Sequence, residues 1–216
     1  METLTRIRGI ALPMLRQNID TDQIIPVVEL TRATEFFNSY ERWGPGLFAY
    51  WRYTDVDART PNPDFILNQE PWRRASILLA DRNFGCGSSR EGAPMALRGY
   101  GFRAVIAPSF SGIFYGNCFR HGLLPVELPI EQIEAIARQT EDTGGTVEVT
   151  VDLERMRVMA PDGTQFGFQT PEALRQMLLD GMDEIDRTLS DRISIDAFRT
   201  SDIGKRPWIY RPGADT

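Results

Sequence analysis

The stretch from residue 75 to residue 98 constrains the fold more than any other part of this chain. It opens with a short apolar run, 75–80, that predicts a buried strand, and it closes with 95–98, which predicts a helix. Gly85 and Gly87 stand between them, and glycine allows a positive φ and a close approach of the backbone to a ligand. A strand, a glycine-rich turn and a helix in this order predict a parallel α/β unit with a candidate binding loop.

Two serines and an arginine follow the glycines of this turn. Ser88 and Ser89 are preferred N-cap residue types, so we expect the helix to begin beside them, with Pro94 in its first turn and Gly99 at its end. The free amides of that helix end, the helix dipole and the guanidinium of Arg90 would together attract a carboxylate or a phosphate. A capped helix after a tight turn is the alternative that needs no ligand, and the combination of glycine, serine and arginine favours the anion site.

The hydrophobic pattern predicts the other elements. Apolar or alternating runs predict strands at 7–13, 102–107, 123–128, 146–151, 155–159 and 165–168. Helices are predicted at 113–120 and 129–140, and a last one is expected to begin at Thr170 as its N-cap. Residues 31–74 lack clean periodicity, which predicts loops with one or two short helices. We therefore expect one domain, 1–216, whose helical extension from about residue 170 packs on it.

Composition argues against several functions. The chain has 216 residues and a net charge of −6, and it lacks a Lys/Arg-rich run, so a nucleic-acid surface is not expected. No apolar run approaches the roughly 18 residues that cross a membrane, and the N-terminal residues lack the apolar segment of a secretory signal, so we expect a cytoplasmic protein. Cys86 and Cys118 are too few for a disulfide framework or for a four-cysteine cluster.

Two other groups of residues could carry chemistry. Asp20 and Asp22 could bind a metal, although an Asx-turn explains the same pair and two carboxylates alone are weak evidence. His121, the single histidine, could form a nucleophilic pair with Cys118 or Cys86. An imidazole at a helix C-terminus, where it faces the helix dipole, is the simpler explanation of His121. We expect no metal site in this chain.

Seven segments, taken together, are similar to those of the 3-isopropylmalate dehydratase small subunit family. They occur in order and at fitting distances, at 18–26, 61–65, 83–91, 100–102, 106–110, 113–117 and 123–126. The match extends over almost the whole chain. The family is a free-standing equivalent of the C-terminal swivelling domain of aconitase, so the resemblance implies an α/β swivelling domain of three layers, β/β/α.

The resemblance implies a hydro-lyase that works with a partner. Members of the family dehydrate and rehydrate a hydroxy-dicarboxylate, converting 2-isopropylmalate to 3-isopropylmalate in leucine biosynthesis. A separate large subunit holds a [4Fe–4S] cluster through three cysteines, and the unligated iron acts as a Lewis acid on the substrate hydroxyl and a carboxylate. We therefore expect no cofactor in this chain and a heterodimer or heterotetramer with an iron–sulfur large subunit.

The resemblance also assigns roles to the glycine-rich turn. Ser88 would be the base that removes the carbon-bound proton, and Ser89 and Arg90 would hold a substrate carboxylate. A serine hydroxyl is a weak base, so the amides of the helix N-terminus and the charge of Arg90 would have to lower the pKa of Ser88.

Further substrate contacts are expected from the first loop. Asp20, Thr21 and Asp22 resemble the family loop that lines the same cleft, where they would orient the substrate rather than react with it. Gly87 and Arg32 complete the expected substrate-binding residues, with Arg32 as a candidate replacement for a cation that the family has after Pro26.

Two departures from the family pattern leave the substrate open. After Pro26 the family usually has Lys or Arg followed by an aromatic residue and Leu, whereas this chain has Val-Val-Glu-Leu at 27–30. After Arg90 and Glu91 the family usually has His, whereas this chain has Gly92. A paralogue that acts on a methyl- or dimethyl-substituted malate is one alternative. A non-catalytic partner of the large subunit and an unrelated anion-binding domain are the others.

We predict that the purified chain carries no iron and has no dehydratase activity until a large subunit is added. The reason is the number of ligands, because two thiols leave a cluster under-coordinated. Iron analysis and an activity assay on the same sample measure this. Stoichiometric iron bound through Cys86 and Cys118 would contradict the prediction.

Overall fold

The structure of the chain is a computed structural model that describes residues 2–34, 39–182 and 184–210. Clustering of the backbone divides the chain into two compact units, Met1–Gly181 and Met182–Thr216. Among the described residues, the first unit contains two four-stranded sheets and a two-stranded hairpin, and the second contains helices. Each unit is described by itself.

A parallel sheet forms the centre of the first unit. Its strands are β2 (Ala11–Met14), β5 (Ile77–Ala80), β6 (Ala104–Ala107) and β7 (Leu124–Glu127), in the order β2-β5-β6-β7. All four residues of β5 and of β6 are buried, as expected for strands covered on both faces. The parallel α/β unit predicted around the glycine-rich turn is therefore confirmed.

The second sheet is antiparallel, as predicted. It contains β1 (Arg6–Gly9), β8 (Val149–Asp152), β9 (Arg157–Met159) and β10 (Gln165–Gly167) in the order β1-β8-β9-β10. A separate short hairpin consists of β3 (Tyr53–Asp55) and β4 (Thr60–Pro61).

The single strand predicted at 7–13 is wrong. The chain leaves the antiparallel sheet at Gly9 and enters the parallel sheet at Ala11, so two strands in two sheets replace one. Pro13 lies inside β2 and does not end it, since Pro13 pairs with Leu79 of β5. A proline is tolerated there because β2 is the edge strand of its sheet and needs a ladder on one side only.

The first unit also contains α-helices. They are α1 (Thr21–Ile24), α2 (Val27–Thr34), α3 (Ala49–Arg52), α4 (Gly92–Tyr100), α5 (Gly112–Arg120), α6 (Ile130–Asp142) and α7 (Glu172–Asp180). Short 3-10 helices lie at Tyr40–Arg42, Gly44–Gly46, Ile66–Asn68 and Trp72–Arg74. The region 31–74 is thus more ordered than the loops that its sequence predicts, although 35–38 lie outside the described residues. Pro171, and not the predicted Thr170, is the N-cap of α7.

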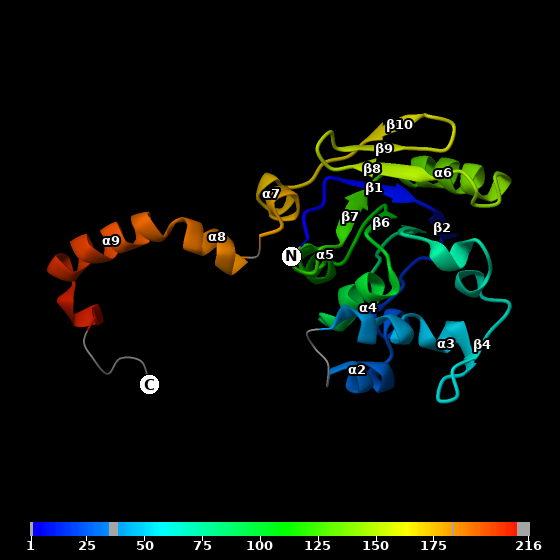
Figure 1. Cartoon of the computed structure of the whole chain (residues 1–216), viewed down its shortest axis with the longest axis horizontal. Coiled ribbons are helices and arrows are strands. Elements are labelled where there is room, and N and C mark those ends of the chain that lie inside the picture. The colour runs from blue at the N-terminus through cyan, green and yellow to red at the C-terminus, as the bar shows by residue number, and fades with distance from the viewer. Residues whose placement is uncertain (1, 35–38, 183, 211–216) are drawn as a thin grey trace. The chain divides into compact units, whose positions relative to one another are not determined.

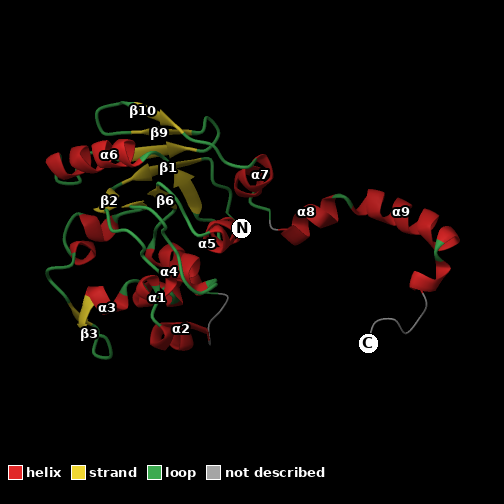
Figure 2. Cartoon of the chain, turned by 180° about the vertical axis from the view of Figure 1, so that it is seen from behind, coloured by secondary structure: helices red, strands yellow, loops and turns green. Residues whose placement is uncertain are grey.

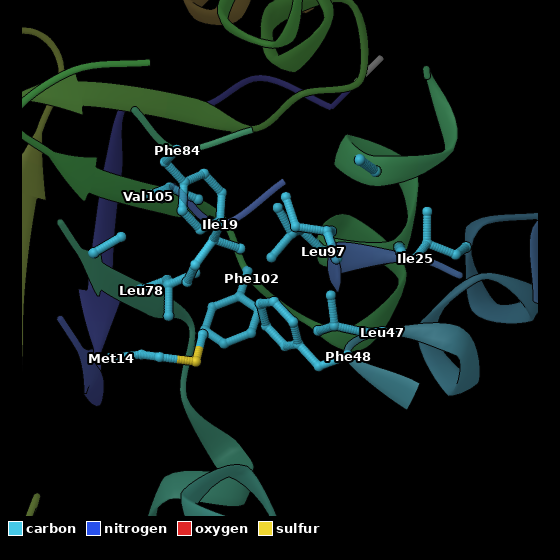
Figure 3. Close-up of a cluster of buried hydrophobic side chains, with 14 of the residues drawn as sticks. Met14, Ile19, Ile25, Leu47, Phe48, Leu78, Phe84, Leu97, Phe102 and Val105 are labelled. Carbon is cyan, nitrogen blue, oxygen red and sulfur yellow. The ribbon is translucent and has the colours of Figure 1, made fainter. Parts of the chain in front are cut away.

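Two apolar cores cover the two faces of the parallel sheet. The core that we call helix-side contains Leu78 and Val105 from the strands together with Phe48 and Phe102, and Figure 3 shows part of it. The opposite core contains Ile77 and other strand residues together with Val151 of β8 and residues of α6. Figure 1 shows the resulting layers, with the antiparallel sheet and α6 on one side and α2, α3 and α4 on the other. The predicted three-layer β/β/α class is confirmed.

The second unit is a short helical segment. It contains α8 (Glu184–Ser190), α9 (Arg192–Lys205) and a 3-10 helix at Pro207–Tyr210. Asp202 is buried within this unit and accepts hydrogen bonds from the guanidinium of Arg206 at 2.8 Å and from the hydroxyl of Tyr210 at 3.0 Å. The helix α7 belongs to the first unit. That the rest of the extension packs on the domain stays a prediction.

Within the described ranges, no helix combines the length and the apolar character that a membrane span requires.

Candidate functional site

The glycine-rich turn lies between two neighbouring loops at the carboxyl edge of the parallel sheet. It follows β5, and the loops that follow β2 and β6 run on either side of it. Two isolated parallel bridges, Asp20 with Cys86 and Phe84 with Phe110, continue the pairing of the sheet beyond its strands. The carboxyl edge of a parallel sheet is where ligands bind in open α/β folds, so this position suits a site.

Backbone hydrogen bonds fix the turn to both neighbours. On one side the amide of Gly85 donates to the carbonyl of Ile19 at 2.7 Å, and the amide of Thr21 donates to the carbonyl of Cys86 at 2.9 Å. On the other side the amide of Phe84 donates to the carbonyl of Ser109 at 3.1 Å. Ile19 of the first loop and Phe84 of the turn also belong to the helix-side core, so each of these two segments is anchored by a buried side chain (Figure 3).

Several residues in these loops adopt the left-handed backbone region. Gly85 has φ of 72° and Gly87 has φ of 88°, as their sequence context predicted, but Asn83 at 59° and Asn18 at 56° share the feature. The side-chain amide of Asn83 donates to the side-chain carbonyl of Asn18 at 2.8 Å. This asparagine pair was not predicted as part of the site. Asparagine is one of the few residues that tolerate this region, so its place beside the glycines was the available signal.

Gly85 is required by space as well as by conformation. A Cβ atom at this position would lie 2.2 Å from the ring of Phe114. That ring packs edge-on against Phe84, with 5.3 Å between the ring centroids. Gly87 differs, since its Cβ would lie 3.5 Å from Asp20, an ordinary contact distance. Gly85 therefore holds the turn on its aromatic support, whereas Gly87 is exposed beside the first loop.

Asp20 caps the short helix α1. Its carboxylate accepts a hydrogen bond from the amide of Gln23 at 2.7 Å, and the side chain of Gln23 accepts one from the amide of Asp20 at 2.9 Å. This reciprocal pattern is a capping box, so the side chain has a structural role of the kind that the Asx-turn alternative describes. Within the described ranges, no group of three or more His, Cys, Asp or Glu residues could hold a metal ion.

Thr21 and Asp22 connect the first loop to the turn. The buried hydroxyl of Thr21 donates to the carbonyl of Ser88 at 2.9 Å. Asp22 forms an ion pair with Arg90 through Nη1 of the guanidinium. The Arg90 side chain is only 18% exposed, whereas that of Asp22 is 52% exposed. The predicted residues Asp20, Thr21 and Asp22 are thus brought against the turn, although they are distant in sequence.

Arg90 keeps part of its guanidinium unused. Its recorded hydrogen bond engages Nη1 alone, and among the described residues none bonds to Nε or Nη2. A guanidinium offers donors in a planar fork that matches a carboxylate. Arg90 can therefore keep its pair with Asp22 and still present donors to a ligand.

The helix predicted at 95–98 is present, but its predicted start beside the two serines is wrong. The helix α4 begins at Gly92, with Glu91 and not a serine at its N-cap, and no side chain caps it. Ser88 and Ser89 instead lie in the turn, where both are exposed. The contact from Thr21 to the Ser88 carbonyl and the pair between Asp22 and Arg90 hold this segment out of the helix. The helix dipole therefore acts farther from Ser88 than its sequence predicts.

The end of α4 also differs from prediction. Pro94 lies in the first turn as expected, but Gly99 lies inside the helix, and Gly101 with φ of 130° follows its last residue, Tyr100. A Cβ at Gly99 would lie 2.0 Å from the carbonyl oxygen of Tyr40, so the glycine allows the neighbouring segment to approach closely.

Arg32 is engaged away from the turn. Its guanidinium pairs with Glu29 at 2.7 Å and with Asp57. The hydrogen bond with Asp57, and then the charge of Glu29, raise the pKa of Arg32. No recorded contact joins Arg32 to the other predicted site residues within the described part of the chain.

Of the two cysteine–histidine pairs considered, the one between Cys118 and His121 does not fit the structure. Cys118 is fully buried, and burial raises the pKa of its thiol well above the usual value, which disfavours a reactive thiolate. His121 is the C-cap of α5, and its Nδ1 lies 3.1 Å from the hydroxyl of Tyr40. Burial also lowers the pKa of His121, so the imidazole is chiefly neutral near pH 7.

Comparison with known proteins gives consistent matches. The model of the aconitase C-terminal domain matches residues 1–131, and the LeuD_N model matches residues 134–171. The 3-isopropylmalate dehydratase small subunit of Cupriavidus necator is 49% identical over 213 residues, covering 99% of this chain and 100% of the relative. The same-named protein of Hahella chejuensis is 46% identical, covering 97% of this chain and 98% of the relative.

A solved structure shares the fold. The crystal structure of the 3-isopropylmalate dehydratase LeuD protein from Methanocaldococcus jannaschii superposes with a TM-score of 0.59 at 25% identity. The match covers 90% of this chain and 99% of that one.

We predict that Gly85→Ala destabilises the protein by about 1–3 kcal/mol, because the new Cβ meets the Phe114 ring and the left-handed backbone is strained. Gly116→Ala is the matched control. It lies inside α5 with no heavy atom within 4 Å of its Cβ, so alanine should stabilise the helix by up to about 1 kcal/mol. Urea denaturation of both variants measures the difference. Equal stabilities would show that the turn can move off the ring.

Proposed function

The chain belongs to the family of 3-isopropylmalate dehydratase small subunits, and from that premise we propose that it is the small subunit of a hydro-lyase. The reaction is the reversible dehydration and rehydration of a hydroxy-dicarboxylate, from 2-isopropylmalate to 3-isopropylmalate in leucine biosynthesis. The observation that carries the proposal is structural. Thr21 and Asp22 contact Ser88 and Arg90 directly, which brings the two predicted segments together at one edge of the sheet.

A large subunit completes the enzyme in this proposal. The name that the relatives bear, small subunit, implies such a partner. We place a [4Fe–4S] cluster in that partner, where it would supply a Lewis acid for the substrate hydroxyl. Cys86 and Cys118 are both free thiols, which agrees with a reducing cytoplasm as the site of the enzyme.

Arg90 is the residue best placed to bind a substrate carboxylate. Its side chain is mostly buried, so a charge-assisted hydrogen bond there is screened less by water than one at the surface. Asp22 holds one side of the guanidinium and so fixes its orientation. Ser89 and the exposed backbone at Gly87 border the same position and are proposed as further contacts.

Ser88 is proposed as the base that takes the carbon-bound proton. Its hydroxyl is exposed at the turn, whereas its carbonyl is fixed by the hydroxyl of Thr21. A fixed backbone with a free side chain suits a group that must meet a substrate brought by a partner. Because α4 begins after Glu91, the proposal relies on the nearby charge of Arg90 and not on the helix dipole.

We propose Arg32 as a further substrate-binding residue. Arg32 contacts two carboxylates, Glu29 and Asp57, and would have to release one of them to bind a substrate. A methyl- or dimethyl-malate is the alternative substrate. The departures from the family pattern at 27–30 and at Gly92 are the reason to consider it.

We predict that Ser88→Ala, reconstituted with the large subunit, loses nearly all turnover while its melting temperature stays close to that of the wild type. An alanine removes the base, but the fixing hydrogen bond is made by the backbone carbonyl and remains. Measuring kcat and Tm on one sample tests this. A normal kcat would remove Ser88 from the mechanism and would favour a non-catalytic partner.

We predict that Arg90→Lys raises KM and lowers kcat. An ammonium lacks the planar fork and cannot hold Asp22 and a carboxylate together in the same geometry. Losing one charge-assisted contact costs about 1.5–3 kcal/mol, or roughly ten- to a hundredfold in kcat/KM. Steady-state kinetics measure this. An unchanged KM would mean that Arg90 holds Asp22 but does not bind the substrate carboxylate.

A further inference from the structure

Glu29 is a buried carboxylate in the first turn of a helix. It lies on α2 and its side chain is only 2% exposed. A buried charge is costly unless it is paired, and Glu29 is paired twice, with Arg32 at 2.7 Å and with Arg59 at 2.5 Å. Gly46 lies against it, since a Cβ there would stand 2.9 Å from the Cβ of Glu29.

The partner Arg59 comes from the hairpin of β3 and β4. Its backbone is left-handed with φ of 56°, and its Nη1 donates to the carbonyl of Pro45 at 3.2 Å. Its guanidinium also lies over the ring of Tyr53, 5.1 Å from the centroid. Asp57 of the same hairpin pairs with Arg32. The four charges Glu29, Arg32, Asp57 and Arg59 therefore form one neutral network, which we call the α2 clamp.

The residue after Glu29 lies against the start of α4. Leu30, next to Glu29, packs so closely on Gly92 that a Cβ there would lie 2.4 Å from it. The ring of Trp43 closes the same space at 2.7 Å. The amide of Ala93 donates to the carbonyl of Arg90 at 3.3 Å, so the backbone of Arg90 is bound to the first turn of α4. Figure 2 shows α1, α2 and α4 gathered on the same side of the first unit.

We propose that Glu29 is a positioning residue of the site: through the α2 clamp it fixes Leu30 on Gly92 and thereby the location of Arg90. This rests on the proposed function. Stability alone is a weak reason for such a network, because a buried ion pair is often no more stabilising than apolar residues of similar volume. Glu29 of the clamp and Gly92 of α4 are both departures from the family pattern, and Leu30, which follows Glu29, lies against Gly92.

The first test needs no activity. In the full chain, Glu29→Gln leaves two guanidinium groups without their carboxylate, and we expect the amides of Ala93 and Met95 to exchange hydrogen at least about tenfold faster. The amide of Val105 in β6 should change little, since it belongs to the centre of the parallel sheet. Equal acceleration of all three amides would mean that Glu29 only stabilises the fold, and it would overturn the proposal.

Glu70→Gln is the matched control. Glu70 also pairs with two arginines, Arg73 and Arg74, but its side chain is 56% exposed. Loss of an exposed carboxylate should alter neither exchange nor activity by more than about twofold. If Glu29→Gln does not fold, Arg59→Gln takes its place, because that side chain is already 33% exposed and its loss is milder.

The second test uses the enzyme reconstituted with its large subunit at saturation. We expect Glu29→Gln and Arg59→Gln each to lower kcat/KM about tenfold, and the double variant to be no worse than the poorer single variant. Additive losses, or a kcat/KM within about twofold of the wild type, would contradict a shared positioning role. A wild-type complex without dehydratase activity would refute the proposed function, whereas the exchange experiment would still decide the role of Glu29.

Discussion

The candidate site depends on parallel pairing that continues beyond the strands. The loops after β2, β5 and β6 stay in register through the bridges of Asp20 with Cys86 and of Phe84 with Phe110. Backbone hydrogen bonds are short-range and directional, so they hold the turn more precisely than side-chain packing could. This extension of the sheet brings the loop of Asp20 and Thr21 against the glycine-rich turn.

The turn meets two demands that only certain residues satisfy. Gly85 must lie on the ring of Phe114, and it must take a left-handed conformation as well. Asn18 and Asn83 accept the same conformation and bond to each other across the two loops. The support beneath the turn is aromatic and buried, whereas its upper surface is polar and exposed. The buried side fixes the backbone of the turn, and the exposed side leaves its polar side chains accessible to a ligand.

Elements that depend on local patterns could be predicted from the sequence. The strands β5 and β6 are buried on both faces and therefore appear as continuous apolar runs. The change of sheet at Ile10 was not predicted, because Gly9 beside it signals an interruption of a strand but does not show that the following residues join a different sheet. Ser88 and Ser89 have the propensity of helix caps, but contacts from a distant loop hold them in the turn.

Charges were the least predictable part of the site. Arg32 was a reasonable candidate for substrate binding by its position in the sequence, yet its partner Asp57 lies on a hairpin that the sequence pattern did not predict. Asp22 and Arg90 were each predicted as site residues, but the ion pair that joins them was not predicted. Propensity describes each residue separately, whereas ion pairs depend on which segments the fold brings together.

The crossing of the chain between two sheets has a consequence for synthesis. β1 lies near the first residue of the chain, but it pairs with β8, and Arg6 bonds to Asp152 across 146 residues. During translation β1 therefore remains unpaired until β8 has been synthesised and most of the first unit has left the ribosome. Contacts of such separation slow folding, and unpaired strands are prone to aggregation. The nascent chain is thus most vulnerable just before β8 emerges.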